Sequence, residues 1–189
     1  MRVRTLGAIA AAICAVVALS GCNSKIGAAA VVGGDTISES TVSHLVTPTS
    51  KPFTPSGSTM QIVPKAYALQ TLIRNRLFAD QLASAGVRPT AADLLAAQNT
   101  ALQGASTAEE TKLLAGYGFS NSFGPEYVKS LALLQIINDK TTNNDAYTAQ
   151  ATKFFNSYPV NVNPRYGKWT ASSLSIGVAD PPAFLASKQ

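Results

Sequence analysis

One segment of the chain, Leu131-Ala-Leu-Leu-Gln-Ile-Ile137, is apolar on nearly all sides. A helix at the surface of a protein carries one apolar stripe, whereas a helix that is apolar all round belongs inside a core. Pro125 and Glu126 suit the first turn of this helix, so we expect it to begin there. The other helices of the chain are expected to pack around it.

Capping signals predict two helices that precede this segment. Pro64 suits the first turn of a helix whose apolar residues recur at helical spacing, and Gly86 ends that helix as a left-handed cap. Thr90 and Asp93 have the spacing of a capping box, which opens a helix that continues to about Leu102. Both helices are therefore predicted with defined ends.

Two more helices are predicted from similar signals. Thr107 and Glu110 repeat the capping-box spacing ahead of an apolar pair. The final helix has an aromatic face and ends before Pro159. The residues on that face are Tyr147, Ala151, Phe154, Phe155 and Tyr158.

Short strands are predicted at both ends of the domain. Ala29–Val32 is apolar and runs into the turn sequence Gly33-Gly34-Asp35, after which Ser38 suits the N-cap of a helix to about Val46. Two later segments alternate apolar and polar residues, Val160–Asn163 and Leu174–Val178. We therefore expect a mainly α fold of several helices, with a small β-sheet formed by strands from the two ends of the chain.

The first residues have the three parts of an export signal. Arg2 and Arg4 supply positive charge, an uncharged apolar run follows, and Ser20-Gly21 precede Cys22. This order resembles a bacterial lipobox, so we expect acylation of Cys22, with Cys14 a weaker candidate. An ordinary secretory signal and a single membrane span are the alternatives, although the run is short for about 30 Å of hydrocarbon.

The chain then divides into four parts. We expect a signal peptide at 1–21, a lipid-anchored tether at 22–28, one helical domain at 29–178 and a flexible tail at 179–189. The 15 Lys and Arg residues exceed the 10 Asp and Glu residues, but two of the arginines lie in the signal. The remaining excess is small and unclustered, which argues against a nucleic-acid partner.

No catalytic or metal-binding constellation is predicted. His44 is the one histidine, and no nucleophile motif accompanies it. One histidine without an available cysteine cannot form a typical zinc site. Glu109 and Glu110 are adjacent and diverge on a helix, while Asn143-Asn144-Asp145 lacks the spacing of a calcium loop. We expect no enzyme activity, no cofactor and no metal.

Aromatic residues in two loops are the candidate binding residues. Phe53 lies in the proline-rich segment Thr47–Thr59, and Tyr117, Phe119 and Phe123 lie in a glycine-rich loop. Such rings commonly fold back as anchors onto the helices, which is the interpretation we favour. The alternative is a deformable apolar surface that binds extended polypeptide clients.

Several motifs, taken in order, resemble the N-terminal domain of SurA-type and PrsA-type chaperones. The motifs are Ala30–Ser38 (AVVGGDTIS), Leu69–Ile73 with Leu77, Ala85–Asp93 (AGVRPTAAD) and Val160–Trp169 (VNVNPRYGKW), the last as in actinobacterial lipoprotein members. The resemblance implies a helical module whose first strand pairs with one near the C-terminus. It also implies a holdase-like role. The interval 138–159 has no room for the parvulin prolyl-isomerase domain of many relatives, so we expect no isomerase activity.

These observations lead to one main functional hypothesis and one competitor. The first is an ATP-independent chaperone or assembly factor, lipid-anchored on the extracytoplasmic face of the cell membrane, that binds unfolded or extended exported polypeptides. The second is a structural or ligand-binding envelope lipoprotein with one dedicated partner. A broad apolar cleft would favour the first, and a closed pocket with convergent polar groups would favour the second.

Overall fold

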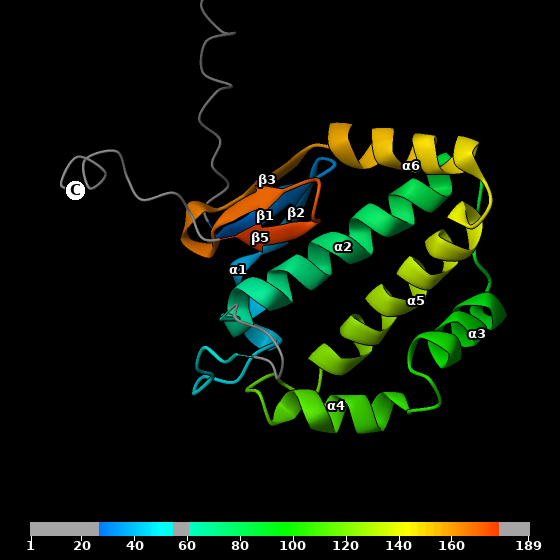
Figure 1. Cartoon of the computed structure of the whole chain (residues 1–189). Coiled ribbons are helices and arrows are strands. Elements are labelled where there is room, and N and C mark those ends of the chain that lie inside the picture. The colour runs from blue at the N-terminus through cyan, green and yellow to red at the C-terminus, as the bar shows by residue number, and fades with distance from the viewer. Residues whose placement is uncertain (1–26, 55–60, 178–189) are drawn as a thin grey trace, which may run out of the picture.

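The computed structural model describes residues 27–54 and 61–177, which form a helical body beside a small β-module (Figure 1). The helices are α1 (Glu39–His44), α2 (Pro64–Ser84), α3 (Ala91–Ala101), α4 (Thr107–Ala115), α5 (Phe123–Thr141) and α6 (Asp145–Ser157). The strands are β1 (Ala28–Val32), β2 (Asp35–Ser38), β3 (Val160–Val162), β4 (Lys168–Thr170) and β5 (Ser175–Gly177). The mainly α class with a small antiparallel sheet is confirmed.

Helix α5 has the central place that its apolar sequence predicts. It packs against α2, α3, α4 and α6, and Leu133 and Ile137 are buried. The helix begins at Phe123 and not at Pro125, so our predicted start was two residues late. Gly124 in its first turn lies against α4, where a Cβ would be 2.7 Å from Thr111 Cβ. The close approach of α4 and α5 therefore depends on the absence of a side chain at Gly124.

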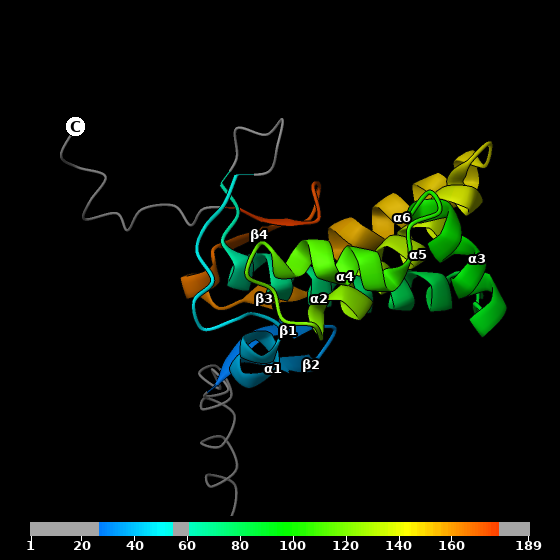
Figure 2. The ribbon, with the colours of Figure 1, turned by 90° about the horizontal axis from the view of Figure 1, so that it is seen from below.

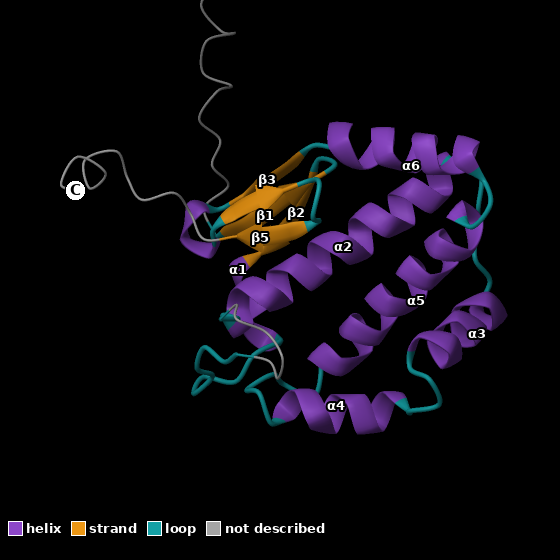
Figure 3. Ribbon diagram, in the orientation of Figure 1, coloured by secondary structure: helices purple, strands orange, loops and turns teal. Residues whose placement is uncertain are grey.

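Helix α2 contributes residues to two hydrophobic clusters. Residues of its N-terminal half, Leu69 and Ile73, pack with β1, α1 and the loop before α5. Residues of its C-terminal half, Phe78 and Leu82, pack with α3, α5 and α6. Figure 3 shows the strands beside the first half of α2 and the other long helices around the second half. One long helix therefore joins the β-module to the helical body.

Strands from the two ends of the domain pair as predicted. The main sheet has the order β2-β1-β3 and is antiparallel, with Val31 opposite both Thr36 and Asn161. Strands β4 and β5 form a separate antiparallel hairpin, in which Trp169 lies opposite Ile176. Figure 2 shows α1 and the β1–β2 hairpin at one side of this module and β4 at the other. Strands β2 and β4 were not predicted as separate elements.

Most predicted helix ends are confirmed. Ser38 caps α1 and accepts a hydrogen bond from Thr41 N. Thr90 and Asp93 form the expected capping box, and Gly86 follows α2 with a φ of +73°.

The capping box before α4 was predicted one residue too late. Ser106 and Glu109 form it, and Thr107 is already the first helical residue. Ser-Thr-Ala-Glu-Glu offers two overlapping pairs with the same spacing. Sequence spacing alone therefore did not distinguish them.

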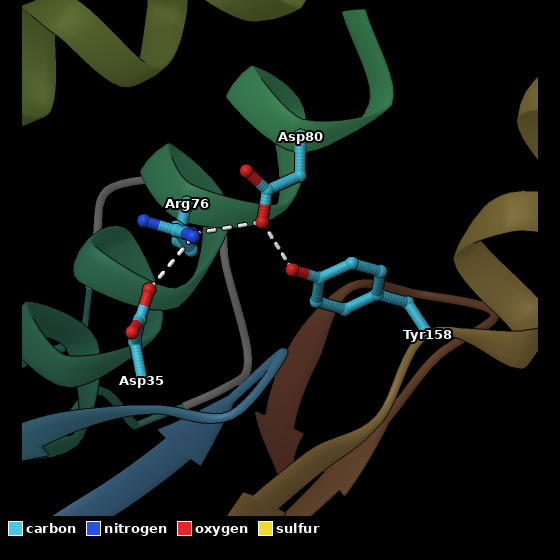
Figure 4. Close-up of polar contacts among 4 residues, drawn as sticks. All are labelled: Asp35, Arg76, Asp80 and Tyr158. Atoms are coloured by element: carbon cyan, nitrogen blue, oxygen red, sulfur yellow. Dashed lines mark hydrogen bonds and ion pairs between the residues drawn. The ribbon is translucent and has the colours of Figure 1, made fainter. Parts of the chain in front are cut away.

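A polar cluster links the β1–β2 turn to α2 and to the end of α6 (Figure 4). Arg76 Nη2 lies 2.7 Å from Asp35 Oδ2, and Arg76 Nε donates to Asp80 Oδ2 at 2.8 Å. The Tyr158 hydroxyl donates to the same Asp80 oxygen. Three elements that are distant in sequence thus share one set of hydrogen bonds.

Candidate functional site

Two of the four aromatic rings predicted to contact clients are buried in the core. Phe119 is 1% exposed and Phe123 is 0% exposed, and their rings stack with centroids 4.2 Å apart. Phe123 belongs to the first turn of α5 and not to the glycine-rich loop. Neither ring offers surface to a polypeptide client, which corrects that assignment for both residues. They serve instead as the anchors of our favoured interpretation.

Phe53 and Tyr117 remain closer to solvent. Their rings stack at 4.6 Å, and Tyr117 is 40% exposed. They line a shallow depression of about 490 Å³ whose other walls are mostly hydroxyl, glycine and lysine residues. Phe53 also exchanges two backbone hydrogen bonds with Ile62, which joins the described stretch that ends at residue 54 to the one that begins at residue 61. This arrangement gives one small aromatic pair and no extended apolar cleft.

A groove between α2 and β5 is the stronger candidate site. It has a volume of about 370 Å³. Its α2 wall is a stripe at helical spacing, and its other wall is formed by β5 and the 3-10 turn at Pro164–Tyr166. The lining residues that the argument uses are Val63, Ala66, Tyr67, Gln70, Arg74 and Ile176. We call this feature the α2–β5 groove.

Side-chain hydrogen bonds hold the two walls of the groove in place. Ile176 N donates to Gln70 Oε1 at 2.9 Å, so an amide on the outer edge of β5 is already satisfied by α2. Arg74 Nε donates to Leu174 O at 2.7 Å and ties α2 to the turn before β5. The groove is therefore a built feature of the fold with defined walls.

The wall of β5 and the 3-10 turn is fixed from the opposite side as well. Tyr166 donates a hydrogen bond to Glu39 Oε2 at the start of α1. Arg165 Nη1 and Glu39 Oε1 form an ion pair at 3.4 Å. This pair is not a hydrogen bond. Burial and the bond to Glu39 raise the pKa of Tyr166 above its ordinary value. The tyrosine is consequently neutral and a donor at physiological pH.

Arg74 supplies the positive charge of the groove. Its side chain is half-buried, and burial lowers its pKa from the ordinary value, although Tyr67 and Tyr127 act in the opposite direction. Within residues 27–54 and 61–177, the ion pairs are those of Arg76 and Arg165, so no described carboxylate pairs with Arg74. A guanidinium has five N–H groups, and the bond to Leu174 uses one of them. The other four are left for water or an anion.

The cavity between α3 and α5 differs in this respect. Its volume is about 340 Å³, and charged residues of both signs line it, among them Arg88, Asp93 and Lys140. Asp93 is engaged by the capping box with Thr90, which lowers its pKa, and the charge of Lys140 contributes in the same direction. The charges of this cavity are thus balanced within it, whereas no described carboxylate lines the α2–β5 groove beside Arg74.

The remaining polar candidates are placed as the sequence suggests. His44 lies exposed in the last turn of α1. Glu109 belongs to the capping box of α4, and Asn144 caps α6. Across the part of the chain that the structure describes, no cluster of three or more His, Cys, Asp or Glu side chains could hold a metal. No helix in that part combines the length and apolar character needed to cross a membrane.

Sequence reasoning missed the groove for a definable reason. It concentrated on the apolar stripe of α2, which faces the core, and left Gln70 and Arg74 on the adjacent stripe unused. The available signal was Arg74, which lies seven residues after Tyr67 and therefore on the same face of the helix. The opposite wall comes from residues 100 positions later, which local patterns do not bring together.

The comparisons with known proteins leave the resemblance to SurA-type and PrsA-type domains as a prediction from sequence motifs. No protein-family model matches the chain, and no curated protein or solved structure matches it.

Proposed function

We propose that this protein is a membrane-anchored, ATP-independent chaperone or assembly factor of the extracytoplasmic space. It would hold extended segments of exported polypeptides in the α2–β5 groove, without prolyl isomerase activity and without a cofactor. The observation that carries this proposal is the groove itself, which joins apolar walls to Arg74, a cation that no carboxylate of residues 27–54 and 61–177 pairs with. Val63 at its rim is 50% exposed and extends the apolar surface of the groove toward solvent.

The dimensions of the groove suit a short extended segment. From Val63 to Arg74 the helix rises about 16 Å, at about 1.5 Å per residue. An extended chain covers that distance with about five residues. Since Gln70 already occupies the amide of Ile176, recognition would depend mainly on side chains and less on added strand pairing. This favours tolerance of many sequences.

A contact of this size supports reversible binding. Five residues bury much less than the roughly 1,200 Å² of a stable protein–protein interface. Ordering an extended chain also costs entropy, which lowers affinity further. A client would therefore leave the groove without an energy source, as an ATP-independent chaperone requires.

Acylation of Cys22 would place this groove near the membrane. Cys22 lies outside the described residues, and β1 begins at Ala28. Six intervening residue steps span at most about 20 Å. The domain would consequently work close to the bilayer, where exported chains emerge.

A blocked groove tests the proposal. Residues 23–189 retain every described residue, and hence both hydrophobic clusters, so they suit a soluble assay. We expect stoichiometric amounts to reduce light scattering by several unrelated unfolding proteins. Ala66→Trp, which fills the groove, should abolish this effect, whereas Ala79→Trp on an exposed position of α2 should not. Unchanged scattering with the unmodified protein would refute a general chaperone.

A dedicated ligand-binding lipoprotein is the second candidate. Gln70 and Arg74 both line the groove and supply the polar groups that one specific partner would need. Binding of one class of molecule, with no effect on unrelated unfolding proteins, would favour this function over the first.

A further inference from the structure

Arg74 closes one end of the α2–β5 groove. It is the last α2 residue that lines the groove, and beyond it Leu77 and Phe78 are buried in the core. Its bond to Leu174 O joins the two walls at this point. A chain that enters from the exposed Val63 rim therefore meets a barrier at Arg74.

The same residue carries a charge that no described carboxylate pairs with. A half-buried guanidinium is costly unless an anion or several hydrogen bonds compensate it. Among the described residues its hydrogen bond is to Leu174 O, and the three ion pairs of the domain involve other arginines. A carboxylate matches the free face of a guanidinium with two parallel bonds. Charge complementarity thus points to an anionic group at the closed end.

We propose that the α2–β5 groove takes the C-terminal end of an extended polypeptide, with its terminal carboxylate on Arg74 and its preceding apolar side chains against Val63, Ala66 and Ile176. This inference rests on the proposed function and adds the part of the client that is recognised. A chain terminus fits because the groove ends where the charge lies. An internal segment would have to continue past the junction of Arg74 with Leu174.

Paired peptides test this inference directly. The probes are fluorescein-labelled Ala-Val-Ala-Leu-Val with a free carboxylate, its C-terminal amide, and the amide of Ala-Val-Ala-Leu-Asp. Fluorescence anisotropy with residues 23–189 measures each affinity. We expect the free acid to bind at least about tenfold more tightly than the first amide, as the loss of a charge-assisted bidentate contact implies. Equal affinity of the Asp-containing amide and the free acid would overturn recognition of a terminus.

Variants identify the residue responsible. Arg74→Met should reduce the affinity for the acid to that for the amide, and Arg74→Lys should restore part of it. Lys65→Met removes the same charge from an exposed position of α2 and should change neither affinity. Thermal unfolding of each variant shows whether it is folded. Should Arg74→Met fail to fold, the acid and amide affinities of the unmodified protein still decide the question.

Two further outcomes separate the possible failures. If acid and amide bind equally and Ala66→Trp abolishes both, polypeptide binding stands and the inference about the terminus is wrong. If neither peptide binds, the proposed function fails together with the inference about the terminus.

Asp180 follows Gly177 by three residues and lies outside the described part of the chain. If Asp180→Asn raises the affinity for the acid about tenfold and leaves that for the amide unchanged, Asp180 competes with the peptide's carboxylate for Arg74, which supports the role given to Arg74.

Discussion

The Tyr158 hydroxyl donates a hydrogen bond to Asp80, which connects the end of α6 to α2 (Figure 4). The tyrosine ring also lies against the turn between β1 and β2. A Cβ built on Gly33 would be 2.7 Å from Tyr158 Cζ, whereas a Cβ on Gly34 would meet nothing within 4 Å. The two glycines share positive φ values, +59° and +98°, but only Gly33 has this neighbour.

We predict that Gly33→Ala and Tyr158→Ala are energetically coupled. Overpacking against a ring costs about 1–3 kcal/mol, and removing the ring removes that cost. The coupling in a double-mutant cycle, measured by denaturant unfolding, should therefore be about 1–3 kcal/mol. Gly34→Ala is the matched control and should combine with Tyr158→Ala additively, within about 0.5 kcal/mol. Equal coupling for both glycines would contradict the contact.

Three partly buried tyrosines predict a loss of stability in alkaline solution. Burial is the main cause that raises the pKa values of Tyr127, Tyr158 and Tyr166, with Asp80 and Glu39 adding to the shift at the last two. A group whose pKa is raised by folding stabilises the protein fully below its unfolded pKa, which is about 10 for tyrosine. That contribution is lost as the pH rises from there through the folded pKa. The tyrosine contribution to the free energy of unfolding should thus be constant near neutrality and fall above about pH 10.

Denaturant unfolding at a series of pH values measures this effect, with tyrosinate absorbance to follow ionisation. Tyr166→Phe removes one of the three groups and should make the alkaline decline less steep. Tyr117→Phe is the control, because Tyr117 is 40% exposed and stacks on Phe53 at the surface. An unchanged alkaline slope in Tyr166→Phe would show that Tyr166 is not involved.

Local signals predicted this fold better than its long-range features. Ser38, Thr90 and Gly86 mark helix ends that the structure confirms, because each acts on backbone groups within a few residues. Ser106 and Thr107 show the limit, since both precede a Glu at the required spacing. The structure selects Ser106, whose hydroxyl accepts from Glu109 N at 3.2 Å.

The candidate site depended on contacts that sequence patterns do not contain. Phe119 and Tyr117 lie two residues apart in one loop, yet one ring is buried and the other is exposed. Their difference comes from the packing of Phe119 beneath Tyr67 and against Phe123. Arg74 likewise takes its place in the groove through a hydrogen bond to Leu174, which is 100 residues away in the sequence. Composition identified the aromatic residues but not which of them face solvent.

Phe119 and Tyr117 can be used to test which loop aromatic anchors the fold and which lies at the surface. We predict that Phe119→Ala destabilises the domain by about 3–5 kcal/mol, as expected for a large ring deleted from a core. Tyr117→Ala should cost less than about 1 kcal/mol, because the ring is 40% exposed and stacks mainly on Phe53. Urea unfolding of residues 23–189 measures both values. Similar costs for the two variants would contradict the burial of Phe119.

Acylation is the prediction on which the location of the groove depends. In cells that receive a clickable fatty acid, Cys22→Ser should abolish labelling of the protein, whereas Cys14→Ser should leave labelling and membrane association unchanged. Cys14 is the matched control because it is the only other cysteine and lies within the apolar run of the signal. Labelled Cys22→Ser protein, or loss of label in Cys14→Ser, would show that Cys22 is not the anchor.

The anchor and the fold should be independent of each other. Residues 23–189 lack Cys22 but keep every described residue, so their unfolding temperature should equal that of the acylated protein in detergent. One acyl chain binds a bilayer only marginally, and stable attachment requires two or more. The acylated protein should therefore stay in the membrane fraction after a high-salt wash, whereas residues 23–189 added to the same membranes should not. Retention of residues 23–189 would mean that the folded surface, and not the lipid, holds the groove near the bilayer.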